Sequence, residues 1–424
     1  MRKILNIEYG AVHATYWMTY AIIGSFASAF LLGRGYSNSE IGVILAVGSV
    51  AAVFLQPVLA DIADRSKKIS LIGLTQIVTV GMMVFTALSF IIQRATIALS
   101  VVFVMLVAWD TALQPLFNSL AFKLEESGHK IKFGINRAMG SLSYSILCSF
   151  LGALTEKAGT QILPVTSEVV LIMMFITLWI VKKHFRRACA VREVEQTAVG
   201  LQKGEMAEED SKESLSSADA AEDINFGRFI KRNKLFVAVS IGVVGLFFSN
   251  SVFNNFMLQI VQNVGGDGGD MGRILSLMAM LEIPALFLFD IIHSRISCKT
   301  LLKIGAVSFF MKILCAYIAD SVTMVYIAQL FQPAAFGIFL PAMVCFIDEI
   351  MDKGEAVKGQ SLYTIMTTVG TIFATLIGGK ILDAGGASEL LLVSTLITGA
   401  GAILIICVVG RVKNKKILKE HVAS

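Results

Sequence analysis

Long apolar segments recur along the whole chain and are separated by short polar ones. Each apolar segment contains about 20 residues, which as an α-helix rising about 1.5 Å per residue can cross the roughly 30 Å hydrocarbon core of a membrane. The pattern therefore predicts an all-α polytopic membrane protein with twelve transmembrane helices. The predicted spans are 11–33, 40–60, 70–93, 96–122, 135–156, 161–182, 235–262, 271–293, 300–319, 323–347, 360–382 and 388–410.

Basic residues are concentrated in alternate loops between these predicted spans. Lys and Arg follow the even-numbered spans and lie near both chain ends, whereas the loops after the odd-numbered spans contain few of them. Because Lys and Arg in short loops favour the cytoplasmic side, we expect a multi-pass protein of the cell inner (cytoplasmic) membrane with both termini cytoplasmic. The main tracts are Arg65, Lys67 and Lys68; Lys130 and Lys132; Lys182, Lys183, Arg186 and Arg187; and Arg411, Lys413, Lys415 and Lys416.

One polar segment is much longer than the others and divides the predicted spans into two sets of six. Residues 193–223 contain ten acidic residues and no aromatic residue. Such a segment cannot bury enough apolar surface to compensate for the entropy lost on folding. We therefore expect a flexible cytoplasmic linker at 191–230 between six-helix bundles at 1–190 and 231–424. Two pseudo-symmetric six-helix bundles around a polar site near the membrane midplane are typical of secondary transporters.

The composition excludes an ordinary soluble enzyme. Hydrophobic residues make up 55% of the chain and charged residues only 16%, whereas soluble domains carry about a quarter charged residues. The net charge of +5 is explained by the loop tracts, so no nucleic-acid partner is expected. The six cysteines and five histidines show no ligand spacing along the chain, and we find no phosphate-binding loop or nucleophile–base set. We therefore expect no metal, no cofactor and no enzymatic activity, and we expect a monomer.

A few ionisable residues lie inside the predicted spans, where a charge costs roughly 2.5–3.5 kcal/mol on insertion scales. Arg137 lies near the start of the fifth span, and its planar guanidinium can hold two oxygen atoms of vicinal hydroxyls or of a carboxylate. Glu282 and Lys312 lie in the middle of the eighth and ninth spans. They form either a structural ion pair or a carboxyl that titrates as a cavity opens, with Lys312 competing for it. Asp110 in the fourth span is a second coupling candidate.

The segment after the second predicted span resembles the signature loop of the major facilitator superfamily. It runs Phe54-Leu55-Gln56-Pro57-Val58-Leu59-Ala60-Asp61-Ile62-Ala63-Asp64-Arg65-Ser66-Lys67-Lys68. In that loop a small residue and Asp are followed by Asp-Arg and further basic residues. The resemblance implies the twelve-helix fold and assigns Asp61, Asp64 and Arg65 to a gating loop whose charge pairs break on opening.

Residues 133–144 resemble the start of the fifth span in the lactose-permease-like (oligosaccharide:proton symporter) branch. In both, an Arg, a Gly three residues later and an aromatic residue seven later occur together, here as Arg137, Gly140 and Tyr144. The resemblance implies that Glu125 pairs with Arg137, that both grip substrate hydroxyls, and that Tyr144 stacks on a sugar ring. From its position alone, Glu125 lies about one turn from a helix boundary and also fits a solvated loop acid.

The C-terminal half departs from that branch where the permease carries ionisable residues. Neutral residues stand at those positions: Ser251, Asn254, Gln329, Gln332, Ala335 and Thr371. The proton relay of the permease is therefore missing, and Glu282 and Lys312 are the intramembrane charges left in this half.

These features predict a secondary active transporter that carries a sugar or glycoside by proton-coupled symport and alternating access. Two alternatives stay open: uptake of a nucleoside or aromatic acid, and proton-coupled drug efflux. The expected partners are a small polar solute, protons and the lipid bilayer. The expected substrate-binding residues are Glu125, Arg137, Tyr144, Asn254, Gln332 and Glu282, and the expected coupling residues are Glu282, Lys312 and Asp110.

Overall fold

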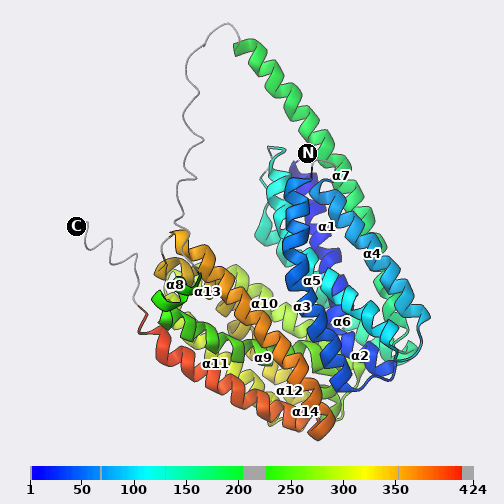
Figure 1. Ribbon diagram of the computed structural model, residues 1–424, viewed down its shortest axis with the longest axis vertical. Coiled ribbons are helices and arrows are strands. Elements are labelled where there is room, and N and C mark those ends of the chain that lie inside the picture. The colour runs from blue at the N-terminus through cyan, green and yellow to red at the C-terminus, as the bar shows by residue number, and fades with distance from the viewer. Residues whose placement is uncertain (1, 67–68, 129, 204–225, 352, 413–424) are drawn as a thin grey trace.

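The computed structural model of the protein describes residues 2–66, 69–128, 130–203, 226–351 and 353–412, and all regular structure in these residues is helical (Figure 1). The N-terminal half contains α1 (Arg2–Tyr20), η1 (Ala21–Ser25), α2 (Ala27–Gly33), α3 (Asn38–Arg65), α4 (Leu71–Ile91), α5 (Ile97–Glu125), α6 (Phe133–Ala158) and α7 (Ile162–Lys203). The C-terminal half contains α8 (Phe226–Arg232), α9 (Lys234–Asn263), α10 (Gly268–His293), α11 (Cys298–Tyr317), α12 (Val322–Ala328), η2 (Gln329–Phe331), η3 (Pro333–Ile338), α13 (Phe339–Ile350) and α14 (Lys353–Val409).

These helices form twelve membrane spans in the described part of the chain. Ten helices are long and apolar enough to cross a membrane, and a bent pair, Ile4–Ser25 with Ala27–Gly33, forms a further span. The twelfth comes from α14, whose 57 residues would extend about 85 Å as one straight helix, far more than a membrane needs. Within α14 the chain turns at Gly386, which has φ 78° and ψ −172°, a conformation open to glycine and strained for other residues. The predicted fold class is confirmed.

The second span of each half begins in the same way. Ser37 caps α3 in a capping box with Glu40, and Asp267 caps α10 in a capping box with Asp270. In such a box the two side chains satisfy backbone N–H groups that the first helical turn leaves without a partner. The repeat supports the pseudo-symmetry of the two halves.

The two halves meet at one end of the molecule and diverge toward the other (Figure 1). At the meeting end, Gly42 of α3 packs on the backbone of Thr375 in α14, and Gly152 of α6 packs on the backbone of α10 at Gly272. A side chain on either glycine would collide with the opposite backbone. We call this the closed end; it contains Asn38, Asp267 and Asp383. The opposite end, with Arg65, Lys183 and Arg411, is called the basic end.

Each half caps a helix of the other half at the closed end. The Asp383 carboxylate in α14 accepts hydrogen bonds from the backbone N–H groups of Asn38 and Ser39, at 3.0 and 2.7 Å, where α3 begins. The Glu156 carboxylate in α6 accepts one from the backbone N–H of Gly268, at 3.1 Å, where α10 begins. Acidic groups at helix N-termini are stabilised by unpaired N–H groups and by the helix dipole. The closed end is therefore held by two equivalent helix caps.

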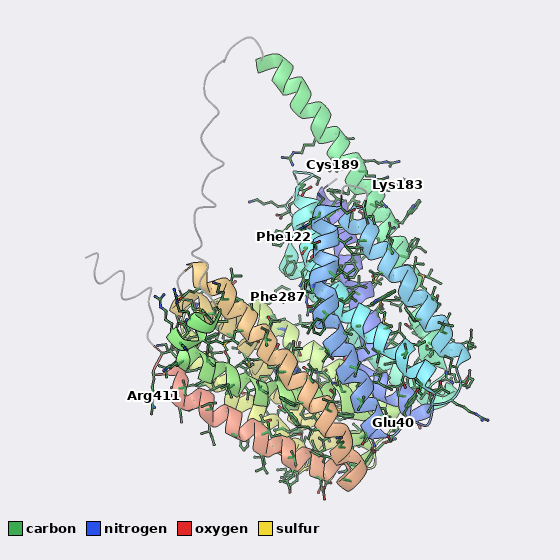
Figure 2. The ribbon with its side chains drawn as sticks, viewed as in Figure 1. Glu40, Phe122, Lys183, Cys189, Phe287 and Arg411 are labelled. Carbon is green, nitrogen blue, oxygen red and sulfur yellow. The ribbon has the colours of Figure 1, made fainter. Side chains whose placement is uncertain are left out.

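Large apolar side chains cover the outside of the helices, as expected of a surface that faces lipid rather than water. Figure 2 shows Glu40 near the junction of the halves and Lys183 and Arg411 at their far ends. Phe122 of α5 and Phe287 of α10 lie in the space between the halves (Figure 2) and are 75% and 55% exposed. Aromatic residues from both halves therefore flank the opening toward the basic end.

The expected linker is only partly within the described residues. The helix α7 continues past its membrane span to Lys203, and α8 begins at Phe226. A flexible chain was expected at residues 191–203 and 226–230, but their backbone is helical. Helix formation thus continues beyond the apolar segment. The acidic segment at 204–225 lies outside the described residues.

Candidate functional site

A central cavity lies between the two halves and consists of two adjoining pockets of about 230 and 310 Å³. Both halves contribute to it, through the first, second, fourth and fifth spans and through the seventh, eighth, tenth and eleventh. The two π-helical segments among the described residues, η1 and η3, each contribute to its wall, and such segments often occur at functional sites. The residues common to both pockets are Trp17, Tyr20, Gln114, Asn250, Asn254 and Phe336.

Arg137 enters this cavity from α6, one turn after the helix begins. Its guanidinium carbon lies 3.9 Å from the centroid of the Trp17 ring, and its Nη1 donates a hydrogen bond to Ser141 Oγ at 3.2 Å. A guanidinium over an indole face is stabilised by about 0.5–2 kcal/mol. This contact fixes the plane of the guanidinium while it leaves several of its five N–H donors for a bound solute.

Glu282, Gln332 and Lys312 form a continuous chain of hydrogen bonds across three helices of the C-terminal half. The Lys312 ammonium in α11 donates to Gln332 Oε1 at 2.5 Å, and Gln332 Nε2 donates to Glu282 Oε1 in α10 at 2.5 Å. Lys312 is 2% exposed, and its ammonium also lies 4.3 Å from the Phe253 ring centroid. The predicted Glu282–Lys312 relation is therefore indirect: an amide connects the two charges.

Asp110 of α5 lines the second pocket and is 2% exposed. Its Oδ1 atom is buried and has no hydrogen-bond partner among the described residues. Burying a charged carboxylate without a partner costs several kcal/mol. The environment of Asp110 thus differs sharply from that of Glu282, whose carboxylate has an amide partner.

Tyr144 and Asn254 also reach the cavity, but both already have partners. The Tyr144 hydroxyl and Ser25 Oγ lie 2.7 Å apart, which ties α6 to the π-helical segment η1. Asn254 Nδ2 donates to the Asn250 carbonyl oxygen one turn earlier, at 3.0 Å. Asn254 lines both pockets.

Glu125 does not lie in the cavity and does not pair with Arg137. It is exposed at the end of α5, where its Oε1 accepts a hydrogen bond from the Ile131 backbone N–H at 2.9 Å. The carboxylate therefore shapes the short loop before α6. The predicted Glu125–Arg137 pair is contradicted by this placement, and the interpretation of Glu125 as a loop acid is correct.

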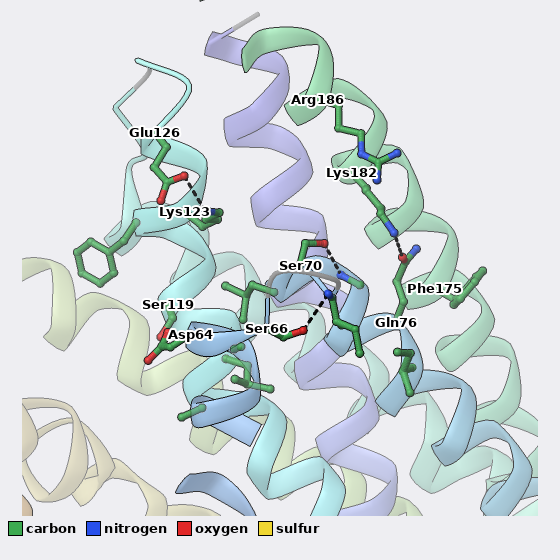
Figure 3. Close-up of a pocket in the computed structure, with 18 of the residues that line it drawn as sticks. Asp64, Ser66, Ser70, Gln76, Ser119, Lys123, Glu126, Phe175, Lys182 and Arg186 are labelled. Atoms are coloured by element: carbon green, nitrogen blue, oxygen red, sulfur yellow. Dashed lines mark hydrogen bonds and ion pairs between the residues drawn. The ribbon is translucent and has the colours of Figure 1, made fainter. Parts of the chain in front are cut away.

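The predicted gating residues lie at the basic end of α3. Asp61 Oδ1 pairs with Arg65 Nε at 2.6 Å on the exposed face of their own helix. Asp64 lines a separate cavity of about 1190 Å³ among α3, α4, α5 and α7 (Figure 3). All residues of this cavity belong to the N-terminal half. The central cavity differs from it in that both halves contribute to its wall.

Some cavity residues were not singled out by the sequence analysis, namely Trp17, Tyr20 and Phe336. Aromatic residues inside an apolar span look like packing residues. The available signal was the spacing of two of them: Trp17 and Tyr20 lie three residues apart and therefore on one helix face. They immediately precede the π-helical segment η1.

Known transporters resemble this chain, some over nearly its whole length and one over part of it. The "Uncharacterized transporter YwbF" of Bacillus subtilis (strain 168) is 23% identical over 419 residues, which cover 97% of this chain and 96% of that protein. A "Putative sugar efflux transporter" of Deinococcus radiodurans is 22% identical over 124 residues, 29% of this chain and 32% of that protein. The crystal structure of nucleoside transporter NupG shares the fold with a TM-score of 0.73 at 13% identity, and the match covers 96% of this chain and 98% of that one.

The family assignment rests on a match that spans most of the sequence. The MFS_1 like family matches residues 9–393, which include all the cavity residues described above. The predicted resemblance to major facilitator transporters is confirmed, whereas the lactose-permease-like branch stays a prediction. The chain therefore belongs to the MFS_1 like family of membrane transporters.

Proposed function

We propose that the protein carries a sugar or glycoside together with protons, by alternating access of the central cavity. The observation that carries the proposal is the presence of Arg137 from one half and Glu282 from the other in a single pocket. A solute bound to both residues contacts both halves at once. Movement of the halves against each other can then expose that solute first to one side of the membrane and then to the other.

The chemistry of the cavity suits a neutral ring that carries several hydroxyl groups. The Arg137 guanidinium donates hydrogen bonds, the Glu282 carboxylate accepts them, and the side-chain amides of Asn250 and Asn254 do both. The faces of Trp17 and Tyr20 can cover the apolar C–H face of a sugar ring. The two adjoining pockets, at about 230 and 310 Å³, together have the size of a small-molecule site.

Glu282 is the proposed coupling acid because its protonation changes the contacts of three helices. In the ionised form it accepts the Gln332 amide, which in turn accepts Lys312. A proton on Glu282 removes the negative charge that offsets the Lys312 ammonium, so the amide can rearrange. A ligand or proton shifts a conformational equilibrium only through such a difference in contacts between states. Asp110 is the second candidate.

The test compares uphill and exchange transport in proteoliposomes. Glu282→Gln imitates the protonated acid permanently, so we expect it to abolish solute accumulation driven by a pH gradient while counterflow of labelled solute continues. The matched control is Glu125→Gln, the same change at an exposed acid outside the cavity, which should retain both activities. If Glu282→Gln still concentrates solute in response to the gradient, coupling lies elsewhere, and Asp110→Asn is tested next.

A nucleoside is the second candidate solute, and the amide side chains of the cavity favour it. Gln114, Asn250, Asn254 and Gln332 line the first pocket, and amides can donate and accept simultaneously along the edge of a nucleobase. Competition of unlabelled sugars, glycosides and nucleosides in the counterflow assay separates the two candidates. Inhibition by nucleosides alone would replace the sugar proposal.

We also propose that the basic end faces the cytoplasm, as the distribution of Lys and Arg indicates. In intact cells, a membrane-impermeant maleimide should label Glu40→Cys at the closed end. It should label Lys183→Cys at the basic end only after the membrane is permeabilised. Both measurements use a background in which the exposed Cys407 is replaced by Ser. Labelling of Lys183→Cys in intact cells would reverse the proposed orientation.

A further inference from the structure

Two cysteines and one histidine meet at the basic end of the C-terminal half. His293 is the last residue of α10, Cys298 is the first residue of α11, and Cys345 lies in α13. Their potential ligand atoms all lie within 4.8 Å of one another. No metal was expected from the sequence, because these residues lack a ligand spacing along the chain. The packing of α13 against the turn between α10 and α11 brings them together.

The separations within the cluster approach those around a tetrahedral metal ion. The Cys298 Sγ atom lies 3.5 Å from His293 Nδ1. Zinc bonds of about 2.3 Å to sulfur and about 2.0–2.1 Å to nitrogen place two tetrahedral ligands about 3.6 Å apart. No separation in the cluster exceeds 4.8 Å, which is at most about 1 Å more than the sulfur–sulfur edge of a tetrahedral zinc site. Small side-chain rotations therefore suffice to complete the geometry.

Acidic side chains surround the cluster, and one of them, Glu349, is the candidate for a fourth ligand. Glu349 follows Cys345 by four residues, so both lie on one face of α13, and its carboxylate contacts the Cys298 side chain. Asp290, Asp348 and Glu349 all act electrostatically on Cys345. Three acids around two thiols and an imidazole favour a bound cation, and thiolate with imidazole is the ligand set that zinc prefers.

We propose that His293, Cys298, Cys345 and Glu349 form a binding site for a divalent zinc-class ion. Cys298 is fully buried and four protein ligands close the site, which is the arrangement of structural rather than catalytic zinc. The ion would join the α10–α11 turn to α13. Through η3, α13 continues the span that carries Gln332. The site therefore braces the helix that connects the two charges of the central cavity, and it does not take part in solute binding.

The test is the metal content of the full-length protein, purified in detergent with a tag that contains no histidine. After incubation with zinc chloride and dialysis, the wild type should retain about one zinc per chain, the stoichiometry of a mononuclear structural site. Cys298→Ser and Cys345→Ser should lose it, whereas the control Cys407→Ser should retain it. With cobalt in place of zinc, the wild type and Cys407→Ser should show thiolate-to-metal absorption.

Thermal unfolding gives a second readout, because an ion that binds only the folded state raises its stability. A chelator should lower the unfolding temperature of the wild type and of Cys407→Ser, and leave that of Cys345→Ser unchanged. If the serine variants do not fold, His293→Gln serves as the test variant. The proposal is overturned if wild-type protein retains no stoichiometric zinc, if the variants retain as much as the wild type, or if thiol counting shows a Cys298–Cys345 disulfide.

Discussion

At the scale of single residues, Gln332 links the two charged side chains of the C-terminal half, Lys312 and Glu282. An amide has one acceptor and two donors, so it can accept from an ammonium and donate to a carboxylate at the same time. Gln332 does both, toward Lys312 and Glu282. A hydrophobic residue at this position would leave two intramembrane charges without their hydrogen bonds, and a carboxylate here would add a third charge.

Removing the charge of Lys312 alone should destabilise the protein more than removing the charges of both Lys312 and Glu282. Lys312→Met leaves the Glu282 carboxylate without the ammonium that compensates it, at a cost of about 3 kcal/mol or somewhat less, since Glu282 faces the cavity. Adding Glu282→Gln should recover part of this loss, with a coupling energy of about 0.5–3 kcal/mol. Thermal unfolding in detergent measures the double-mutant cycle. Lys183→Met, at an exposed lysine, is the control and should have little effect; strictly additive effects of Lys312→Met and Glu282→Gln would show that the two residues are uncoupled.

Arg137→Lys should weaken solute binding while the fold is kept. Lysine retains the charge but loses the planar fork that lies on Trp17 and donates to Ser141. We expect the Kd of the solute identified by counterflow to rise at least about tenfold, or about 1.4 kcal/mol. Arg65→Lys, in the exposed pair with Asp61, should leave Kd unchanged. Equal affinity of Arg137→Lys and wild type would make Arg137 a packing residue.

At the scale of elements, the apolar pattern was sufficient to predict the spans, because lipid requires every spanning segment to satisfy its own backbone. The pattern could not predict how a helix deviates from regularity. The π-helical segments η1 and η3 lie within apolar runs. No change from apolar to polar residues marks where they begin or end, so a hydropathy pattern does not detect them. The resemblance was a poor guide to Glu125 for a different reason: this residue lies at the exposed end of α5, about three turns beyond Gln114, the last α5 residue that lines the central cavity.

Gly386 separates the last two spans, and its replacement should be costly. With φ 78° and ψ −172°, this backbone conformation is essentially limited to glycine, so Gly386→Ala should cost about 1–3 kcal/mol of stability. The thermal unfolding temperature should fall accordingly. Gly134→Ala is a matched control, because its new Cβ would meet no atom within 4 Å and alanine favours helix. An unchanged unfolding temperature for Gly386→Ala would mean that the turn relaxes at little cost.

At the scale of the whole molecule, the two halves pack closely at the closed end because glycines lie in the contact. A larger side chain at such a glycine should weaken the contact. In Gly42→Val the added side chain meets the Thr375 backbone of the other half, so the contact between α3 and α14 is disfavoured. We expect the population to shift toward a conformation that is open at this end and shut at the basic end. A cysteine at Phe122, exposed between the halves here, should then react more slowly with an aqueous maleimide. Gly134→Val, in open space, should not slow the reaction; equal rates in all three proteins would show that the glycine contact does not control the equilibrium.

The residues of the central site were predictable in part from the sequence. Polar residues within a membrane span need partners or water, so Arg137, Glu282, Gln332 and Asn254 could be selected from the sequence, and the structure brings all four to one pocket. The hydrogen bonds among them could not be predicted from the sequence, because the link through Gln332 depends on how α10, α11 and the tenth span pack together. The cluster of His293 with two cysteines was missed for the same reason, since Cys345 lies far along the chain from His293 and Cys298, and only the packing of α13 brings it to them.

The two acid caps at the closed end make the position of the conformational equilibrium sensitive to ionic strength. Asp383 and Glu156 are exposed, and the attraction of an exposed carboxylate for a helix N-terminus is worth about 0.3–1 kcal/mol and is screened by salt. Both caps must break when this end opens, so their contributions add to about 0.6–2 kcal/mol. Raising the salt concentration weakens that contribution and can change the ratio of the two conformations by up to about 30-fold. We therefore expect salinity on the side of the membrane that the closed end faces to shift the conformational equilibrium, without any site for a specific ion.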